Sequence, residues 1–288
     1  MSGQMPADGG RHAADHPFAA FDRFGSASLT DLASLAELQT RFDRKFVAPV
    51  DVLGPLSAAL DDRMRVLEVA GRREFTYDTW YVDTPDLQTY QDHVQGRRRR
   101  FKLRSRTYVE QSLTMLEVKL KGLRGRTVKR RLAHPEADTS RVGAAAQAFF
   151  NDVLRDEYQM ACPTQLGPTA RTWYVRMTLA DLEVGERITI DRSFEVESGE
   201  RRVRFDPGMV LIEVKSPTFR GGSLPVLTSL GLQPAAVSKY GVAVTTLYDT
   251  PRGNRWLPVL RDLDPRMTRG SSSSGSGSCI SRSDATAA

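Results

Sequence analysis

Basic side chains recur at every second position in short segments of this sequence. The segment FKLRSRTY puts Lys102, Arg104 and Arg106 on one face of an extended strand, because successive side chains of a strand point to opposite faces. The segment MLEVKLK likewise puts Glu117 and Lys119 together. Rows of guanidinium and ammonium groups at this spacing are suited to binding several phosphate groups, whose oxygens accept hydrogen bonds and carry negative charge.

Three later segments follow the same alternation. They group Tyr174 with Arg176, Arg187 with Thr189 and Asp191, and Glu213 with Lys215. A single strand of this kind normally turns its charged face to water. Because the pattern repeats over six or seven strands, we favour a closed barrel, in which the apolar faces turn outward under helices and the charged faces line the interior. Such an interior must hold water and a polyanion, since buried like charges are costly.

The remaining segments predict helices around this barrel. The predicted helices are 29–38 behind a cap at Ser28, 49–60, 87–93, 142–158, 224–230 and 239–247. The expected fold is α+β, with a closed antiparallel eight-stranded β-barrel and peripheral helices. Polar composition further predicts a largely disordered segment at 1–38, one ordered domain at 39–262 and a disordered Ser/Gly-rich tail at 263–288.

Composition excludes several classes of protein. The chain has 288 residues and a net charge of +6, which favours an anionic partner without identifying it. Neither the two cysteines nor the four histidines have the spacing of a disulfide framework or a zinc site. No signal-peptide pattern and no run of about 18 apolar residues is present, so we expect a cytoplasmic protein without a membrane-spanning segment. Phosphate-binding glycine motifs of the P-loop and Rossmann types are absent.

Some features allow two interpretations from the residues alone. The run Arg97 to Arg100 is typical of a nucleic-acid patch, or its alternate members face the barrel interior while the others extend into solvent. No RNP-type aromatic platform, helix-turn-helix or zinc finger accompanies it, so no nucleic-acid partner is expected. Tyr174 could pack in the core or donate to a phosphate. Arg187 and Asp191 share a face and could form an ion pair, whereas we interpret His93 as structural.

Nine short motifs occur in a characteristic order. They are RFDRKF (41–46), YVDTPDLQTY (81–90), FKLRSRTY (101–108), LEVKLK (116–121), VKRRL (128–132), TWYVRM (172–177), RITIDRSF (187–194), LIEVKS (211–216) and SKYG (238–241). Their order resembles the VTC domain, the catalytic domain of polyphosphate polymerases in the triphosphate tunnel metalloenzyme superfamily, over about residues 41–248. The chain lacks the additional sensor and membrane domains of eukaryotic members and is similar to the stand-alone bacterial form.

The resemblance implies a role for each matching residue. It implies catalytic contacts to phosphate from Lys45, Arg104, Arg106, Arg176 and Lys215. It implies further substrate contacts from Lys102, Lys119, Lys129, Arg131, Tyr174, Arg187, Ser238, Lys239 and Tyr240. It also implies a divalent metal, Mn²⁺ or Mg²⁺, on Glu213 with Glu117 as a second carboxylate. The first motif departs from the family pattern Glu-x-Lys-Tyr, because the shorter Asp43 stands in place of the glutamate.

The implied activity is transfer of the γ-phosphoryl group of ATP to a growing polyphosphate chain inside a basic tunnel. No Ser/His/Asp or Cys/His set is needed, because phosphoryl transfer depends mainly on positioning and electrostatics. Two alternatives keep the same tunnel. In a triphosphatase, Asp43 or Glu117 would orient a water molecule. In a non-catalytic polyphosphate-binding module, the cations would remain and the metal would be dispensable.

Overall fold

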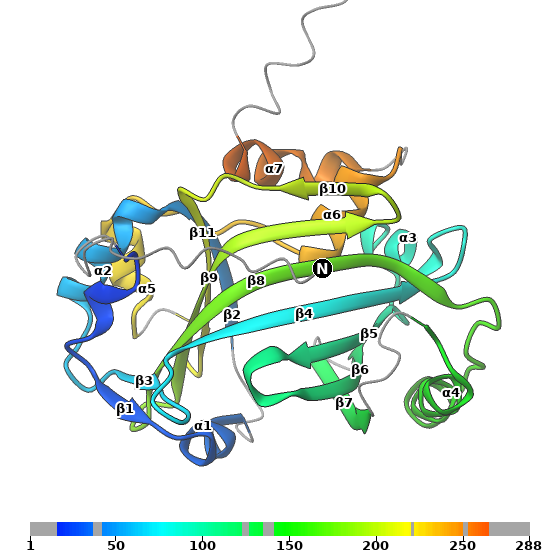
Figure 1. Cartoon of the computed structure of the whole chain (residues 1–288), viewed down its shortest axis with the longest axis horizontal. Helices are drawn as coiled ribbons and strands as arrows, with labels where there is room; N and C mark the ends of the chain where they lie inside the picture. Colours follow the sequence, from blue (N-terminus) through cyan, green and yellow to red (C-terminus); the bar gives the residue numbers. More distant parts are fainter. Residues whose placement is uncertain are drawn as a thin grey trace, which may run out of the picture.

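One sheet, antiparallel except for the parallel pair β1–β3, and surrounding helices make up the protein in the computed structural model (Figure 1). The described residues are 16–36, 42–122, 127–134, 141–219, 222–249 and 253–264. The predicted tail from residue 265 onward and residues 1–15 lie outside them. The strands are β1 Gly25–Ala27, β2 Phe42–Pro49, β3 Arg65–Leu67, β4 Glu74–Asp83, β5 Phe101–Tyr108, β6 Leu113–Lys121, β7 Thr127–His134, β8 Gly167–Asp181, β9 Glu186–Ser198, β10 Arg201–Arg204 and β11 Met209–Ser216.

Seven α-helices and four short 3₁₀ segments connect and cover the described strands. They are η2 Ala19–Phe21, α1 Leu29–Ala36, η3 Val50–Val52, α2 Leu53–Ala59, α3 Gln88–Val94, η4 Val109–Gln111, α4 Ala144–Tyr158, α5 Leu224–Ser229, α6 Lys239–Leu247, η7 Gly253–Trp256 and α7 Leu257–Leu263. The predicted helix 239–247 is confirmed to the residue, and the others to within a few residues. Helix α7 was not predicted. Among the described residues, no helix has the length and apolar character needed to cross a membrane.

The predicted closed barrel is wrong. The sheet is open and has eleven strands, eight of which follow one path in the order β2-β11-β9-β8-β4-β5-β6-β7. Strands β2 and β7 end this path and are not paired with each other in the described part of the chain, while β1, β3 and β10 pair at its margin. Alternation specifies which face a side chain occupies, but closure also requires matched strand tilt and register stagger. Charged residues along the exposed strand β7 protect its free edge from pairing.

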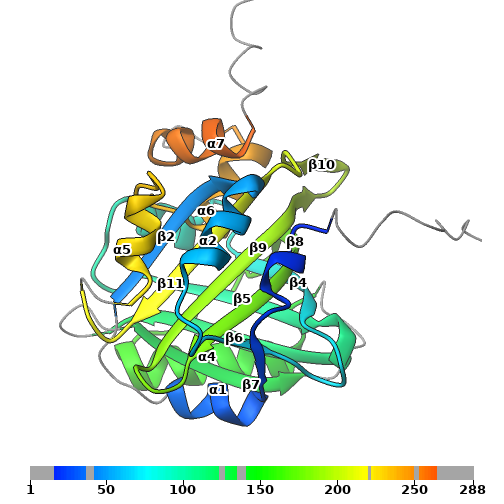
Figure 2. The same ribbon diagram turned by 90° about the vertical axis from the view of Figure 1, so that its left-hand side faces the viewer.

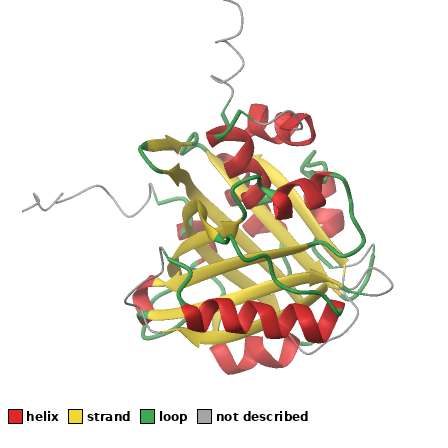
Figure 3. Ribbon diagram, turned by 90° about the vertical axis from the view of Figure 1, so that its right-hand side faces the viewer, coloured by secondary structure: helices red, strands yellow, loops and turns green. Residues whose placement is uncertain are grey.

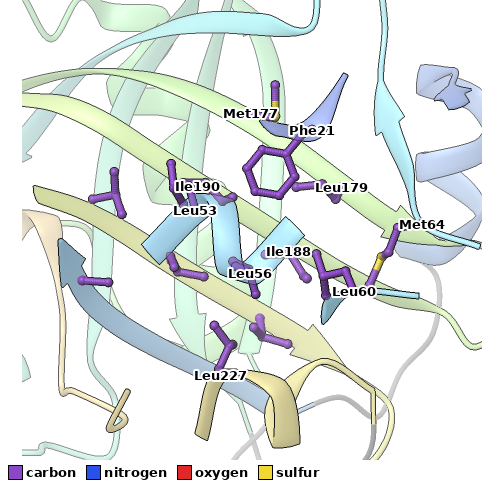
Figure 4. Packing of buried hydrophobic residues seen from close by; sticks show 14 of the residues in the cluster. Phe21, Leu53, Leu56, Leu60, Met64, Met177, Leu179, Ile188, Ile190 and Leu227 are labelled. Carbon is purple, nitrogen blue, oxygen red and sulfur yellow. The ribbon is translucent and has the colours of Figure 1, made fainter. Parts of the chain in front are cut away.

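The outer face of β2, β11, β9 and β8 carries the largest apolar core. Leu53 and Leu56 of α2 pack against Ile188 and Ile190 of β9, and Leu227 of α5 closes the same cluster (Figures 2 and 4). Each fully buried side chain of this size contributes about 1.5–3 kcal/mol relative to an exposed one. The expectation that the apolar strand faces turn outward under helices is therefore confirmed for this half of the sheet.

Helix α4 covers the other half of the sheet. The ribbon of Figure 3 shows this long helix lying across the strands. Its residues Phe150 and Leu154 are buried against Leu103 of β5 and Val118 of β6. The hydroxyl of Tyr158, at the last residue of α4, lies 2.8 Å from the carbonyl oxygen of Arg100, at the residue before β5. The apolar pattern of 142–158 thus positions the strands that carry the basic rows.

Residues before the first long strand also pack on the sheet. Phe18 and Phe21 are buried in the same cluster as α2, so the packed part of the chain begins before the predicted boundary at residue 39. Helix α1 has the predicted cap at Ser28, because the Asp31 amide donates to Ser28 Oγ at 3.1 Å and the Ser28 amide donates to Asp31 Oδ2 at 2.8 Å. This reciprocal pair satisfies backbone donors that a helix start leaves without partners.

Candidate functional site

Strand register assigns the charged side chains to one face of the sheet, which we term the inner face. Residues directly opposite each other in an antiparallel pair lie on the same face. The inner face carries Asp43 and Lys45 of β2, Glu213 and Lys215 of β11, Arg187, Thr189 and Asp191 of β9, Arg176 of β8, Thr79 of β4, Lys102, Arg104 and Arg106 of β5, Glu117 and Lys119 of β6, and Lys129 and Arg131 of β7. Every strand residue with a predicted phosphate or metal role lies on this face, including Tyr174, which is opposite Tyr77 in the β4–β8 register.

Three lysines form a row across neighbouring strands. Lys102 of β5 lies opposite Lys119 of β6, which lies opposite Lys129 of β7. Burial, followed by repulsion from Lys45, lowers the pKa of Lys119 to about 8, so β2 approaches β6 although the sheet is open. Unit charges about 6 Å apart repel each other by about 3 kcal/mol at an effective dielectric constant near 20. Such a row is therefore stabilised by an anion that binds between its members.

Lys102 connects this row to the start of helix α6. Its ammonium donates to Ser238 Oγ at 2.8 Å and lies 3.3 Å from His93 Nε2. Burial, with repulsion from Lys119 and Lys45, holds the pKa of Lys102 well below its ordinary value. Ser238 Oγ also accepts the Gly241 amide at 3.1 Å, as expected for the residue that caps a helix.

Glu117 is fully buried among basic side chains. Its Oε2 accepts from Arg104 Nε at 2.6 Å and lies 3.7 Å from Arg106 Nη1, and its Oε1 contacts the Lys129 ammonium. Burial alone would raise the pKa of Glu117, but Arg104, Arg106 and Lys129 outweigh burial and lower it. Arg106 Nε also donates to Thr79 Oγ1 at 3.1 Å. Glu117 therefore holds both arginines of the FKLRSRTY segment in place.

A second buried carboxylate orients the basic groups of β8 and α6. Asp191 accepts from Arg176 at 2.5 and 2.8 Å and from the Lys239 ammonium at 2.5 Å. Burial would raise the pKa of Asp191, whereas Arg176 and Lys239 lower it. Tyr174 is 1% exposed and stacks on Tyr77, with ring centroids 5.3 Å apart. The Lys239 ammonium lies 4.5 Å from the centroid of the Tyr174 ring. Tyr174 is therefore a buried aromatic residue that packs beneath the cations of the site.

The inner face carries several carboxylates that could hold the implied metal. Glu213 is the better match, because its side chain is 20% exposed and its ion pair in the described part of the chain is with Lys215, which also lies 3.6 Å from Asp43. Mg²⁺ and Mn²⁺ commonly bind through one or two carboxylates together with substrate phosphates, so Glu213 with Asp43 fits this pattern. Within the described residues, no group of three or more His, Cys, Asp or Glu side chains forms a protein-only metal cluster.

Glu117 fits a metal less well than Glu213. Both its oxygens already contact cationic groups, and its side chain is 0% exposed. A metal there would have to displace Lys129 or Arg104. We therefore assign Glu117 to the support of the arginines, and only Glu213 and Asp43 are retained as candidate metal ligands.

Tyr240 supports helix α6 from beneath. Its hydroxyl donates to Asp83 Oδ2 at 2.5 Å, and Asp83 also accepts the Thr89 and Tyr90 amides at the start of α3. Tyr240 is 2% exposed, so its hydroxyl is committed to Asp83 and not to the inner face. The last residue of the SKYG motif, Gly241, packs so closely on the indole of Trp256 that a Cβ would lie 2.4 Å from that ring.

The remaining predicted residues occupy the margins of the inner face. Lys45 donates to the Val237 carbonyl at 3.1 Å, just before α6. Arg131 lies opposite Glu117 in the register but is exposed on the edge strand β7, and Arg187 lies opposite Lys215. Tyr77 was not predicted to be part of the site. The alternation in EFTYDTWYVD could have revealed it, since Tyr77 shares a face with Thr79.

Comparison with known proteins gives one family and several distant folds. The VTC domain matches residues 40–248. No curated protein matches the chain significantly. A candidate adenylyl cyclase from Hippeastrum, reported to have a dominant triphosphatase activity, is 16% identical at a TM-score of 0.48 and covers 74% of this chain and 98% of its own. A candidate adenylate cyclase from Bacillus halodurans is 11% identical at a TM-score of 0.44 and covers 73% and 98%, respectively.

A candidate adenylate cyclase from Vibrio parahaemolyticus is 13% identical at a TM-score of 0.41 and covers 69% of this chain and 95% of its own. At these TM-scores the three similarities carry no argument about function. The family match is different in kind, because it extends over most of the chain and over the nine ordered motifs. The chain belongs to the VTC domain family.

Proposed function

We propose that this protein is a metal-dependent polyphosphate polymerase that transfers the γ-phosphoryl group of ATP to the end of a polyphosphate chain bound along the inner face. The activity and both substrates come from the family resemblance. The observation that supports them is the row Lys102–Lys119–Lys129 with Lys45 beside it. Like charges directly opposite each other destabilise a sheet, so this row makes physical sense as a binding site for a polyanion.

The inner face offers two kinds of group to a phosphate chain. Arg104, Arg106 and Arg176 are held by buried carboxylates and present fixed guanidinium forks. Lys45, Lys102 and Lys119 form no ion pair with a carboxylate in the described part of the chain and act as point charges. Fixed arginines position the phosphates, and the lysines offset the negative charge that develops on the transferring group.

The transfer itself requires no covalent enzyme intermediate. An oxygen of the terminal phosphate of the acceptor chain forms a bond to the γ-phosphorus of ATP, while the bond from that phosphorus to the bridging β–γ oxygen breaks. ADP leaves, and the acceptor is one phosphate longer. A divalent cation held by Glu213 and Asp43 would supply further charge neutralisation at the phosphate oxygens.

One assay tests the proposal directly. The purified protein is supplied with ATP and Mn²⁺, and the products are separated into long polyphosphate chains and free phosphate. We expect long chains with stoichiometric ADP. Free phosphate without chains would contradict the polymerase and support the triphosphatase. The absence of both products would support the binding module.

The variant Glu213→Ala distinguishes the two enzyme hypotheses from the binding-module hypothesis. Glu213→Ala removes the proposed metal carboxylate and is expected to lower turnover at least about 100-fold, a loss typical of one missing charge-stabilising group. Tripolyphosphate binding without metal should be retained, because the cations remain. The matched control is Glu200→Ala, which removes an exposed carboxylate in the turn before β10. Full activity in Glu213→Ala would contradict the metal role, and an equal loss in Glu200→Ala would contradict its specificity.

A further inference from the structure

The run of arginines before β5 has no role in the proposed transfer. Arg97 to Arg100 connect the end of α3 to β5, and Arg97, Arg98 and Arg99 are exposed. Charge runs on a surface are usually only solvated, so the run alone does not indicate a site. Two further observations concern its position and its rigidity.

The arginine run continues the basic row of β5. Arg100 precedes Lys102 by two residues, and the side chains of Lys102, Arg104 and Arg106 follow at the same interval on the inner face. The Lys102 ammonium lies 3.3 Å from His93 Nε2, so this end of the row meets helix α3 beside the loop, and repulsion from Arg100 contributes to the lowered pKa values of both groups. Arg255 is at the same end, because its guanidinium donates to the His93 carbonyl at 3.4 Å.

The loop that carries the run is held in one shape. Arg100 Nη1 donates to the carbonyls of Gly96 at 3.1 Å and Arg97 at 2.6 Å. The Tyr158 hydroxyl of α4 lies 2.8 Å from the Arg100 carbonyl and anchors the loop to the helix beneath. Arg97 Nε donates to Gln95. In the described part of the chain, no ion pair occupies Arg98 or Arg99, so a prearranged loop presents two arginines to solvent.

We propose that Arg98 and Arg99 form an external subsite for polyphosphate, contacting the chain where it passes beyond the inner face at the Lys102 end of β5. This inference rests on the proposed function and adds a preference for long chains. Residues 100 to 106 of an extended strand span about 20 Å, so a triphosphate held at Arg104 and Arg106 does not reach the loop. Only a chain long enough to pass Lys102 contacts both arginines.

The test compares a short and a long anion on one variant. Arg98→Ala/Arg99→Ala is expected to weaken binding of polyphosphate of about 60 phosphates by roughly fivefold to tenfold, and to reduce the slope of log affinity against log salt by about 1 to 2, since each lost phosphate contact removes about 0.7 for a flexible single strand. Tripolyphosphate affinity should change less than about twofold. Arg98→Lys/Arg99→Lys should restore most of the long-chain affinity, because the charge is retained.

The matched control is Arg72→Ala/Arg204→Ala, which removes the same charge from two exposed arginines outside the loop and the inner face. An equal loss of long-chain affinity in this control would show that the effect comes from net charge alone, and would overturn the proposal. The proposal is also overturned if the loop variant loses equal affinity for tripolyphosphate and for the long chain. It is overturned too if the loop variant loses affinity for neither anion. If the unaltered protein binds neither anion, the proposed function fails and not the subsite alone.

Discussion

Glu117 provides the sharpest test of how the site is built. Glu117→Gln keeps the shape of the side chain and removes the one negative charge that Arg104, Arg106 and Lys129 share. Breaking a buried ion pair by neutralising one partner typically costs about 3–5 kcal/mol, because the remaining charges stay buried without compensation. For a domain of about 200 residues, each kcal/mol lowers the melting temperature by about 2–4 °C, so we expect a decrease on the order of 10 °C.

The pH dependence follows from the direction of the pKa shift. The pKa of Glu117 is lower in the folded state than its ordinary value of 4.5. A carboxylate shifted in this direction contributes stability that is fully present above the unfolded pKa and is lost as the pH falls through the folded pKa. The difference in unfolding free energy between the unaltered protein and Glu117→Gln should therefore shrink as the pH falls below about 4.5.

Urea unfolding of both proteins from pH 3 to pH 8 measures this difference. Adding tripolyphosphate should stabilise Glu117→Gln more than the unaltered protein, because the anion replaces the missing compensation. A stability equal to that of the unaltered protein at pH 7 would refute the structural role of Glu117. Normal stability together with lost Mn²⁺ affinity would instead show that Glu117 is a metal ligand.

Two further predictions concern single residues of the site. Lys119, whose pKa is lowered to about 8, should take up a proton when tripolyphosphate binds near pH 8, and affinity should fall as the pH rises past 8, where the unbound lysine is neutral. Calorimetry in buffers of different ionisation enthalpy measures this uptake, which Lys119→Met should reduce; an unchanged uptake would contradict the assignment. Tyr240→Phe removes one hydrogen bond to Asp83 and should cost about 1.5–3 kcal/mol of stability, with tripolyphosphate affinity unchanged. A large loss of tripolyphosphate affinity with normal stability would instead show that the Tyr240 hydroxyl contacts the phosphates.

The sequence predicted the faces of the strands better than their connections. Lys102, Arg104 and Arg106 share a face in any extended chain, so their common orientation was predictable from spacing alone. The cap at Ser238 was also predictable, because the side chain satisfies an amide within the same turn. The pairing of Glu117 with Lys129 and the contact of Lys102 with His93 depend on the register between strands and on how α3 packs, and neither is encoded locally.

Closure of the sheet was the main error, and its cause is physical. Alternation is a local property of the backbone, so the residues by themselves determined that one face of the sheet is basic and the other apolar. Whether β2 and β7 meet depends on twist and stagger accumulated over the eight strands of the path, which no single segment controls. The tertiary structure alone decided that the sheet stays open, that Glu117 and Asp191 are buried among the cations, and that Lys45 approaches Lys119 from the far end of the sheet.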